Sequence, residues 1–589
     1  MALLLSAACG SRTRANYPAV IVLGIDGMDP AFLEAHWAEL PHLDKLRREG
    51  EFQRLATTMP PQSPVAWSTF ITGTSPERHG IYDFVHRNPR TLLPFSSLGE
   101  AAAARGITLG AWRIPLGSPR IHSFRRGAAF WESLKSRGIP VTLVKVPMDY
   151  PPADDADDAL AGLGVPDMQG TFGTFTFFTD DPSETSRDVP GGRIVPVRIE
   201  NHRAMLRVTG PPNPFRSDAR PAGIDITADL DPTQPIARFT LGHQAFILRE
   251  GEWSDWIEID FPLLWPFSAR GMFRVYAKRL AGGFGVYVSP VNIDPAKPEA
   301  KISAPASFSA QLARAAGLYY TQGIPQDTAA LRQHVFDRAE YLAQSRAASR
   351  EQLALLMRAL DGFRGGLLFF HFFGVDQDSH MLWRKFDAEL LDTYRMVDSA
   401  IGDVERRMPE AMLVVMSDHG FTEFNRAVNL NTWLLSQGYL RLRRPLSEDA
   451  HELLANADLK SSSAYAMGLN SLYLTHVDAT LLGEIAEKLR EYRDPETGAP
   501  VVTATFAPPV RGDYVPDLIV GYAPGYRGSW DAALGGIGRA VVEDNQDEWI
   551  GDHCIDPRFV PGVLLSNRKT GLANPSLQNL PQRIMARFE

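Results

Sequence analysis

Two apolar stretches near opposite ends of the chain constrain its fold more than any other feature. The first, AVIVLGIDG at residues 19–27, ends in Asp26, and the second, AMLVVMSDHG at residues 411–420, ends in Asp418 and His419. Uninterrupted apolar runs that close on an acid and a glycine are typical of buried parallel strands followed by a turn. Ligands of open α/β sheets bind at the carboxyl ends of such strands. We therefore expect Asp26, Asp418 and His419 to meet at one sheet edge.

A third apolar run, GGLLFFHFFGVDQDSH at residues 365–380, carries a further pair of candidate metal ligands. Asp376 and His380 are four residues apart, so on a helical turn their side chains share one face and can reach one cation. A solvated helix face is the alternative interpretation, but the position directly after a buried strand favours a site. Asp378 competes with Asp376 for the role, and we expect His371 to be a core histidine.

Each of these groups also has a structural explanation when taken alone. An acid directly after a strand is common in turns, where its side chain accepts a backbone hydrogen bond. This applies to Asp26 and to Asp418. His553, in EWIGDHCID, is an isolated histidine of the kind that is often structural, and the adjacent Asp552 is equally suited to a turn. The hypothesis of a metal site therefore depends on these residues converging.

Ser63 is the candidate nucleophile. It lies in PPQSPVAWSTFITG, whose prolines hold the serine in a rigid turn and whose remainder predicts a helix that ends at Gly73. At a helix N-terminus the backbone N–H groups favour an anion. No G-x-S-x-G motif or neighbouring base accompanies the serine, so a metal must activate its hydroxyl. Ser68 and Thr69 are rivals, but they would lie inside the helix.

The residues after the first strand predict one long helix. DPAFLEAHWAELPHLDKLRREG, residues 29–50, has the apolar spacing of an amphipathic helix, with Asp29 as its cap and Pro30 in its first turn. We therefore expect Asp29 to be occupied by the helix and unavailable to a metal.

Composition excludes several classes of protein. The chain has 589 residues, which suggests two to four domains, and its 44% hydrophobic and 22% charged content is that of a globular protein. A net charge of -9 without a block of Lys or Arg argues against a nucleic-acid-binding face. No apolar run reaches the roughly 18 residues of a membrane span. Two cysteines exclude a disulfide framework, and Cys554 is expected to be a small buried residue and not a metal ligand.

The first 16 residues, MALLLSAACGSRTRAN, resemble a bacterial lipoprotein signal with Cys9 as the acylated residue. The stretch lacks a basic start, and its apolar part is short for a signal peptide. We expect an exported lipoprotein in the periplasm or on the cell surface, attached to the membrane through lipidated Cys9. The alternative is a cytoplasmic protein with an unstructured leader.

Three regions follow the leader. Residues 17–184 alternate strand and helix signals, as do residues 303–589, within which residues 447–525 form a possible small lobe. Residues 185–302 instead alternate apolar and polar side chains between Gly, Pro and Asp turns, which predicts antiparallel sheet. The expected fold class is α/β, with a mostly parallel central sheet flanked by helices and an inserted antiparallel β domain.

The ordered set of these motifs resembles the alkaline phosphatase superfamily, and within it the type I phosphodiesterase/nucleotide pyrophosphatase branch. The matching pieces are IDG at 25–27, the serine of PPQSPVAWSTFITGTSPERHGIYDF, VDQDSH at 375–380, SDHGF at 417–421 and GDH at 551–553. The resemblance implies an alkaline-phosphatase-like core that covers most of the chain outside the β insert.

The resemblance also implies a site with two divalent metal ions. It places one ion on Asp26, Asp418, His419 and the Ser63 oxygen. It places the other, beside the attacking water, on Asp376, His380 and His553. Zinc is the usual metal of this branch and suits the mixture of Asp and His, with manganese as the alternative.

The implied function is hydrolysis of a small-molecule phosphate ester, monoester or diester, through a phosphoseryl intermediate on Ser63. Nucleotide pyrophosphatases have an Asn three residues after the nucleophile, where this chain has Ala66, and the C/S-x-P-x-R pattern of sulfatases is absent. Two alternatives remain: a phosphomutase or phosphotransferase of the same superfamily, or a catalytically inactive exported binding lipoprotein. Substrate choice is expected to reside in the insert and the lobe. Candidates on core turns for substrate contact are Trp67, Trp112, Arg113 and Lys145.

Overall fold

The structure is a computed structural model that describes residues 17–102, 105–117, 120–446 and 454–589. The expected leader with Cys9, and residues 447–453 at the start of the expected lobe, lie outside the described residues. No helix in the described part of the chain combines the length and the apolar character that crossing a bilayer requires.

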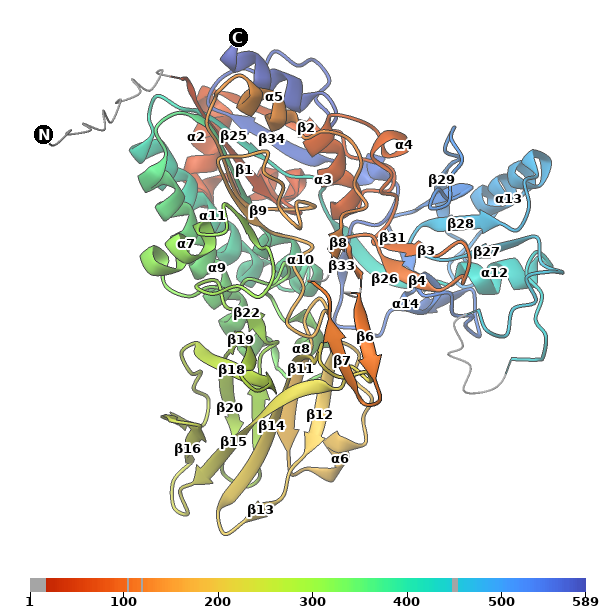
Figure 1. The fold of residues 1–589 in the computed structure, drawn as a ribbon. Coiled ribbons are helices and arrows are strands. Elements are labelled where there is room, and N and C mark those ends of the chain that lie inside the picture. Colours follow the sequence, from red (N-terminus) through yellow and green to blue (C-terminus); the bar gives the residue numbers. More distant parts are fainter. Residues whose placement is uncertain (1–16, 103–104, 118–119, 447–453) are drawn as a thin grey trace, which may run out of the picture.

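An eight-stranded sheet forms the centre of the molecule (Figure 1). In spatial order its strands are β2 (Glu51–Leu55), β34 (Gly562–Ser566), β25 (Met412–Met416), β1 (Ala19–Ile25), β24 (Gly366–Phe372), β9 (Val141–Val146), β10 (Asp158–Ala161) and β23 (Ser303–Ala304). The five strands from β25 to β10 pair in parallel, whereas β2/β34, β34/β25 and β10/β23 are antiparallel. The expected α/β class with a mostly parallel central sheet is confirmed.

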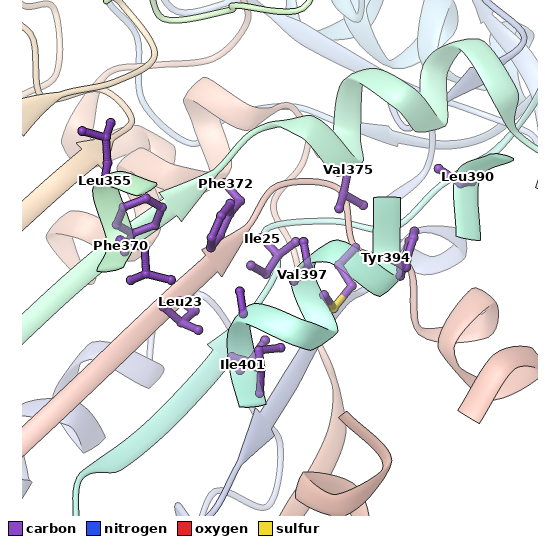
Figure 2. Close-up of a cluster of buried hydrophobic side chains, with 14 of the residues drawn as sticks. Leu23, Ile25, Leu355, Phe370, Phe372, Val375, Leu390, Tyr394, Val397 and Ile401 are labelled. Carbon is purple, nitrogen blue, oxygen red and sulfur yellow. The ribbon is translucent and has the colours of Figure 1, made fainter. Parts of the chain in front are cut away.

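Helices cover both faces of this sheet because its strands are apolar on both sides. In β1, Ile21, Leu23 and Ile25 face one cluster of buried side chains (Figure 2), and Val20 and Val22 face another. The first cluster includes α1 (Pro30–His36), α2 (Pro41–Glu49), α7 (Phe308–Ala316), α8 (Thr328–Arg332), α9 (Arg338–Gly362), α10 (Gly374–Leu382) and α11 (Asp387–Arg407). The second includes α3 (Ser63–Thr72), α5 (Phe130–Ser136) and α15 (Leu580–Met585).

The prediction of one helix over residues 29–50 is wrong. The segment forms α1, a 3-10 turn at Trp37–Glu39, and then α2. Pro41 has no N–H to continue the hydrogen-bond ladder and restricts the residue before it, so it begins a new helix instead. Asp29 caps α1 as expected, since its Oδ1 accepts the Phe32 N–H at 2.8 Å.

Antiparallel strands dominate the region between β10 and β23. One sheet contains β13 (Ile199–Glu200), β14 (Arg203–Pro212), β15 (Pro221–Leu230), β16 (Ile236–Leu241) and β17 (Gln244–Arg249). A second contains β18 (Ile257–Leu264), β19 (Phe267–Phe273) and β22 (Asn292–Ile293), and a third β12 (Gly192–Pro196), β11 (Phe175–Thr179), β21 (Gly285–Val288) and β20 (Val275–Arg279). Strand β11 precedes the expected boundary at residue 185 yet pairs with β12 and β21 inside the insert.

A smaller sheet lies beside the carboxyl edge of the central one (Figure 1). Its strands are β27 (Ala464–Ala466), β28 (Ser471–Leu474), β30 (Leu518–Tyr522) and β29 (Val502–Phe506), and it packs with α12 (Leu430–Ser436) and α13 (Ala479–Glu491) around a core of its own. Strand β26 (Thr422–Val428) joins β31 (Gly525–Gly528), β32 (Val542–Asp544) and β33 (Gly551–Asp552), the strand directly before His553. The chain thereby returns to the sheet edge where the acids lie.

Candidate functional site

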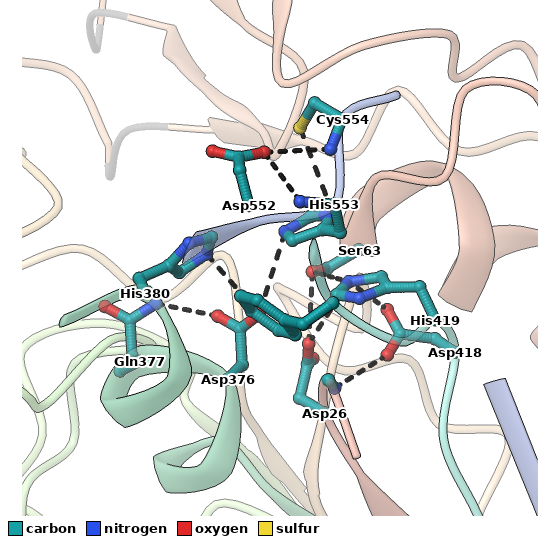
Figure 3. Close-up of polar contacts among 12 residues, drawn as sticks. Asp26, Ser63, Asp376, Gln377, His380, Asp418, His419, Asp552, His553 and Cys554 are labelled. Carbon is teal, nitrogen blue, oxygen red and sulfur yellow. Dashed lines mark hydrogen bonds and ion pairs between the residues drawn. The ribbon is translucent and has the colours of Figure 1, made fainter. Parts of the chain in front are cut away.

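The end of β1 and the start of α3 place Asp26 against Ser63 (Figure 3). Ser63 is the first residue of α3, and its Oγ lies 3.1 Å from Asp26 Oδ1 and 3.3 Å from His419 Nε2. Asp26 is fully buried, and its other oxygen accepts the Trp67 indole N–H at 2.8 Å and lies 3.0 Å from His371 Nε2. The nucleophile candidate therefore faces a carboxylate whose position is fixed from behind.

Asp418 and His419 come from the end of β25, the strand next to β1. Asp418 Oδ1 accepts the Gly27 N–H at 3.2 Å, whereas Oδ2 lacks a hydrogen-bond partner and lies 3.2 Å from His419 Nε2. His419 Nε2 is also 3.7 Å from Asp26 Oδ1. Three oxygens, including that of Ser63, thus surround one imidazole nitrogen.

The second group comes from α10 and from the residue after β33. His380 Nε2 lies 3.5 Å and His553 Nε2 3.7 Å from Asp376 Oδ1, an oxygen that has no hydrogen-bond partner. The His553 ring also stacks on that of His419, with centroids 3.5 Å apart, so the two groups are contiguous. The structure therefore brings together all seven residues of the expected site.

Hydrogen bonds to backbone carbonyls set the tautomer of each histidine. Nδ1 of His380 lies 2.7 Å from Gly551 O, Nδ1 of His553 2.6 Å from Pro61 O, and Nδ1 of His419 3.2 Å from Gly420 O. Because a carbonyl only accepts, each Nδ1 carries the hydrogen, and each neutral Nε2 presents a lone pair to the site. Burial lowers the pKa of all three imidazoles, which favours this neutral form.

The carboxylates are held in an environment that opposes their charge. Burial, and then the charge of Asp26, raises the pKa of Asp376 and Asp418 well above the ordinary value. Lone pairs of three imidazoles and the unpartnered oxygens of Asp376 and Asp418 all point into the same space. Without a positive charge between them these groups repel one another, and the oxygens lack any partner.

Divalent cations fit this arrangement. The ligand atoms of Asp26, Asp418 and His419 lie within 4.8 Å of one another, as do those of Asp376, His419 and His553. Asp and His in such sets are ligands of zinc, and carboxylates also suit manganese. These residues can hold the metal ions that the family implies, with His380 Nε2 as a further nitrogen beside Asp376.

The competing acids are engaged elsewhere. Asp378 accepts hydrogen bonds from the hydroxyls of Tyr341, Ser345 and Thr393, so it points away from the site. Asp552 accepts the backbone N–H groups of the two residues that follow it and lies 2.8 Å from Arg527 Nε. Burial is the largest single effect and would raise its pKa, but the Arg527 guanidinium, the neighbouring histidines and the Cys554 N–H together outweigh burial and lower it.

Cys554 and Thr69 are not free for chemistry either. Cys554 is buried and close to Asp552 and His553, but the carboxylate of Asp552 is held by Arg527 and Nδ1 of His553 by Pro61 O. Burial also raises the pKa of the Cys554 thiol, which favours the neutral form. Thr69 lies within α3, and its Oγ1 is 2.9 Å from His79 Nε2.

Several supporting residues were not predicted. His371, expected to be a core histidine, is buried but contacts Asp26, and Trp67 donates to Asp26 where substrate contact was expected. Lys145 Nζ donates to Tyr320 O, and Trp112 and Arg113 lie on β7 (Trp112–Pro115), an edge of an exposed hairpin. The supporting role of His371 could not be predicted from the apolar run of β24. A buried histidine that contacts a site carboxylate and one that only packs in the core have the same sequence context.

A cavity of about 320 Å³ adjoins the site. Ser63, Asp376, His380 and His553 line it, whereas Asp26, Asp418 and His419 do not. A substrate in this cavity can therefore bring its reactive group to Ser63 and to the Asp376 side of the site.

Comparison with known proteins places the chain in a family. The profile of the type I phosphodiesterase / nucleotide pyrophosphatase family matches residues 20–184 and 279–527, more than half of the chain. No curated protein matches the sequence.

Similar solved structures include two of phosphonoacetate hydrolase from Sinorhizobium meliloti 1021. The complex with phosphonoacetate has 14% sequence identity and a TM-score of 0.47, and that with phosphonoformate 12% and 0.46. Each match covers 97% of this chain and 96% of the other. The extent of the family match, and not these distant likenesses, decides the assignment. The chain belongs to the type I phosphodiesterase/nucleotide pyrophosphatase family, and is thus a hydrolase that acts on phosphoryl groups.

Proposed function

We propose that this protein hydrolyses phosphate esters, monoesters or diesters, with Ser63 as the nucleophile and two divalent metal ions, zinc or alternatively manganese, in its site. The observation that carries the proposal is the position of Ser63. Its Oγ meets Asp26 Oδ1 at 3.1 Å and His419 Nε2 at 3.3 Å, among the acids and imidazoles of the expected metal site. When bound, the metal ions would neutralise charge on the phosphoryl oxygens and make the serine hydroxyl more acidic.

The residues of the chain contribute position and electrostatics. Trp67 and His371 hold Asp26, and Asp26 in turn orients the Ser63 hydroxyl. As the first residue of α3, Ser63 also lies where backbone N–H groups and the helix dipole stabilise an anion. Attack of Ser63 Oγ on phosphorus breaks the ester bond and leaves a phosphoseryl group. Water then attacks this phosphorus and the bond to Ser63 Oγ breaks. Phosphate departs when the substrate is a monoester and a phosphate monoester when it is a diester, and a proton from the attacking water restores the Ser63 hydroxyl.

A hydrolysis panel tests the proposal. Phosphate monoesters, phosphate diesters, phosphonates and sulfates are compared on zinc-loaded protein, on chelated protein and on Ser63→Ala. We expect turnover of at least one phosphate ester that chelation and Ser63→Ala both abolish, and a phosphorylated serine in the rapidly quenched wild type. Turnover that survives in Ser63→Ala, or the absence of turnover with every ester, contradicts the proposal.

A further inference from the structure

The cavity beside the site is lined mainly by apolar side chains from distant parts of the chain. They are Phe84, Phe172, Ile324, Phe373, Trp530 and Leu534. Phe373 follows β24 of the central sheet, and Leu469, a further lining residue, lies in the expected lobe, so core and lobe contribute to one lining. A volume of about 320 Å³ is at the lower end for ligand cavities. The lining therefore suits a small group with an apolar body.

Apart from Asp376, which belongs to the expected metal site, the charged groups in this lining already have partners. Arg527 is the one Lys or Arg residue among the described lining residues. Its Nε lies 2.8 Å from Asp552 Oδ2, Nη1 donates to Gly528 O, and its guanidinium stacks 3.9 Å from the Trp530 ring centroid. Asp327 accepts the Tyr287 hydroxyl and caps α8 through the Ala330 N–H. An anionic group in the cavity would thus meet no uncommitted cation on the described lining.

Gln326 is the exception among the polar lining residues outside the expected metal site. It is 2% exposed, and neither its amide nitrogen nor its amide oxygen has a hydrogen-bond partner. The neighbouring amides are satisfied: Gln322 donates to Ile324 O, and Gln377 donates to Asp376 Oδ2 at 2.8 Å. Because a buried amide without a partner destabilises a fold, a glutamine of this kind in a cavity lining indicates a ligand that completes it.

We propose that this cavity is the leaving-group subsite, and that it takes an uncharged alcohol or phenol with an apolar body and one neutral hydrogen-bonding group recognised by Gln326. The inference rests on the proposed ester hydrolysis. A bond from Ser63 Oγ to phosphorus forms while the bond from phosphorus to the alcohol oxygen breaks. The electron pair leaves with that oxygen, the proton of the Ser63 hydroxyl passes to solvent water, and water returns a proton to the alcohol oxygen, so that the neutral alcohol is released.

Three aryl phosphate esters with phenols of matched acidity provide the test. One ring carries a neutral acetyl group, one a halogen without hydrogen-bonding capacity, and one a sulfonate. We expect kcat/KM for the acetyl ester to exceed that for the sulfonated ester by about 10-fold or more, since a buried anion without a counter-charge is strongly disfavoured.

Gln326→Leu should lower kcat/KM for the acetyl ester by about 10-fold and leave the halogenated ester within about threefold. Gln352→Leu is the matched control. Gln352 is also a buried glutamine with an unpartnered amide oxygen, but it lies on α9 outside this cavity. We expect it to leave the ratio between the esters unchanged.

The outcomes separate this inference from the proposed function. If wild type hydrolyses the sulfonated ester as well as the acetyl ester, the subsite assignment is overturned while ester hydrolysis stands. An equal loss for all three esters in Gln326→Leu assigns Gln326 a structural role and overturns its recognition role. If wild type, with any metal, hydrolyses no ester, the proposed function fails before the subsite is tested.

Discussion

The two halves of the site differ in how their residues are held. On one side, Asp26 is fixed by Trp67, His371 and the Ser63 hydroxyl, and only Ser63 of this half, which we call the sealed half, lines the cavity. On the other, the open half, Asp376 Oδ1 has no hydrogen-bond partner, and His380 and His553 bond to backbone carbonyls through the far side of their rings. The proposed nucleophile thus lies in the more firmly fixed half, whereas all three residues of the open half line the cavity.

The largest effect should come from the nucleophile itself. Ser63→Ala removes the attacking oxygen, and we expect kcat to fall by about 10³-fold or more. Ser68→Ala is the control, because Ser68 is buried in the same helix and its Oγ has no hydrogen-bond partner. It should keep turnover within about twofold. Comparable losses in both variants would show that α3 contributes through packing and that the sealed half has no nucleophile.

Next in size is the contrast between two acids of α10. Asp376→Asn should lower kcat by about 100-fold or more, since it removes the charge of a proposed metal ligand. Asp378→Asn should instead lower the free energy of unfolding by about 1–3 kcal/mol, because Asp378 accepts three buried hydroxyl groups. Steady-state kinetics and urea unfolding distinguish the two. The reverse pattern would show that Asp378, and not Asp376, is the functional acid of the open half.

A smaller effect on activity is expected from Trp67, which supports Asp26 in the sealed half. Trp67→Phe removes the indole N–H that donates to Asp26 Oδ2 at 2.8 Å but keeps an aromatic ring in the core. Loss of such a support for a metal-ligating carboxylate costs about 10-fold in activity. Trp433→Phe, in the separate core of the small sheet, is the control and should leave kcat unchanged. Equal rates for wild type and Trp67→Phe would mean that Asp26 needs no support from α3.

The smallest effect is a pH dependence of the free energy of unfolding, and it comes from Asp327 in the cavity lining. Burial raises the pKa of Asp327 to about 6, above its ordinary 3.8. Between pH 4 and pH 6 the folded protein therefore holds a proton that the unfolded chain loses. The contribution of Asp327 to the free energy of unfolding is complete below pH 4, falls as pH rises from 4 to 6, and stays constant above pH 6.

Asp327→Asn should remove this dependence, which is on the order of 2 kcal/mol. Asparagine can still cap α8 through its Oδ1, while its amide nitrogen can donate to the Tyr287 oxygen. Urea unfolding of both proteins between pH 4 and 7 measures the difference, which should widen in favour of the variant as pH rises to 6. A constant difference across this range would show that Asp327 titrates normally.

Much of the fold was predictable because its strongest signals are uninterrupted apolar runs. The apolar runs of β1, β24 and β25 placed three neighbouring strands, and the acids directly after β1 and β25 followed from the rule that parallel strands end at one edge. The helix over residues 29–50 failed because an apolar pattern continues across Pro41 although the backbone hydrogen bonds do not. Strand β11, which precedes the expected start of the insert, pairs with β12.

Parts of the site depend on contacts that no single stretch of sequence contains. Asp376 and Asp378 are equivalent in the motif, and they are distinguished only by the hydroxyls that α9 and α11 bring to Asp378. His371 supports Asp26 from a strand that otherwise appears purely apolar. Gln326 lies in a loop without any motif, and its unpartnered amide is visible only once the surrounding side chains are placed.

The most direct test of the account is the metal content of purified protein and of two single variants. We expect about two divalent ions per chain in wild type, measured by elemental analysis after extensive dialysis. Asp376→Asn and Asp418→Asn should each retain about one, because each removes a ligand from a different half of the site. Wild-type protein that binds no ion when supplied with zinc or manganese, or variants that keep both ions, would contradict the claim that these seven side chains form a two-metal site.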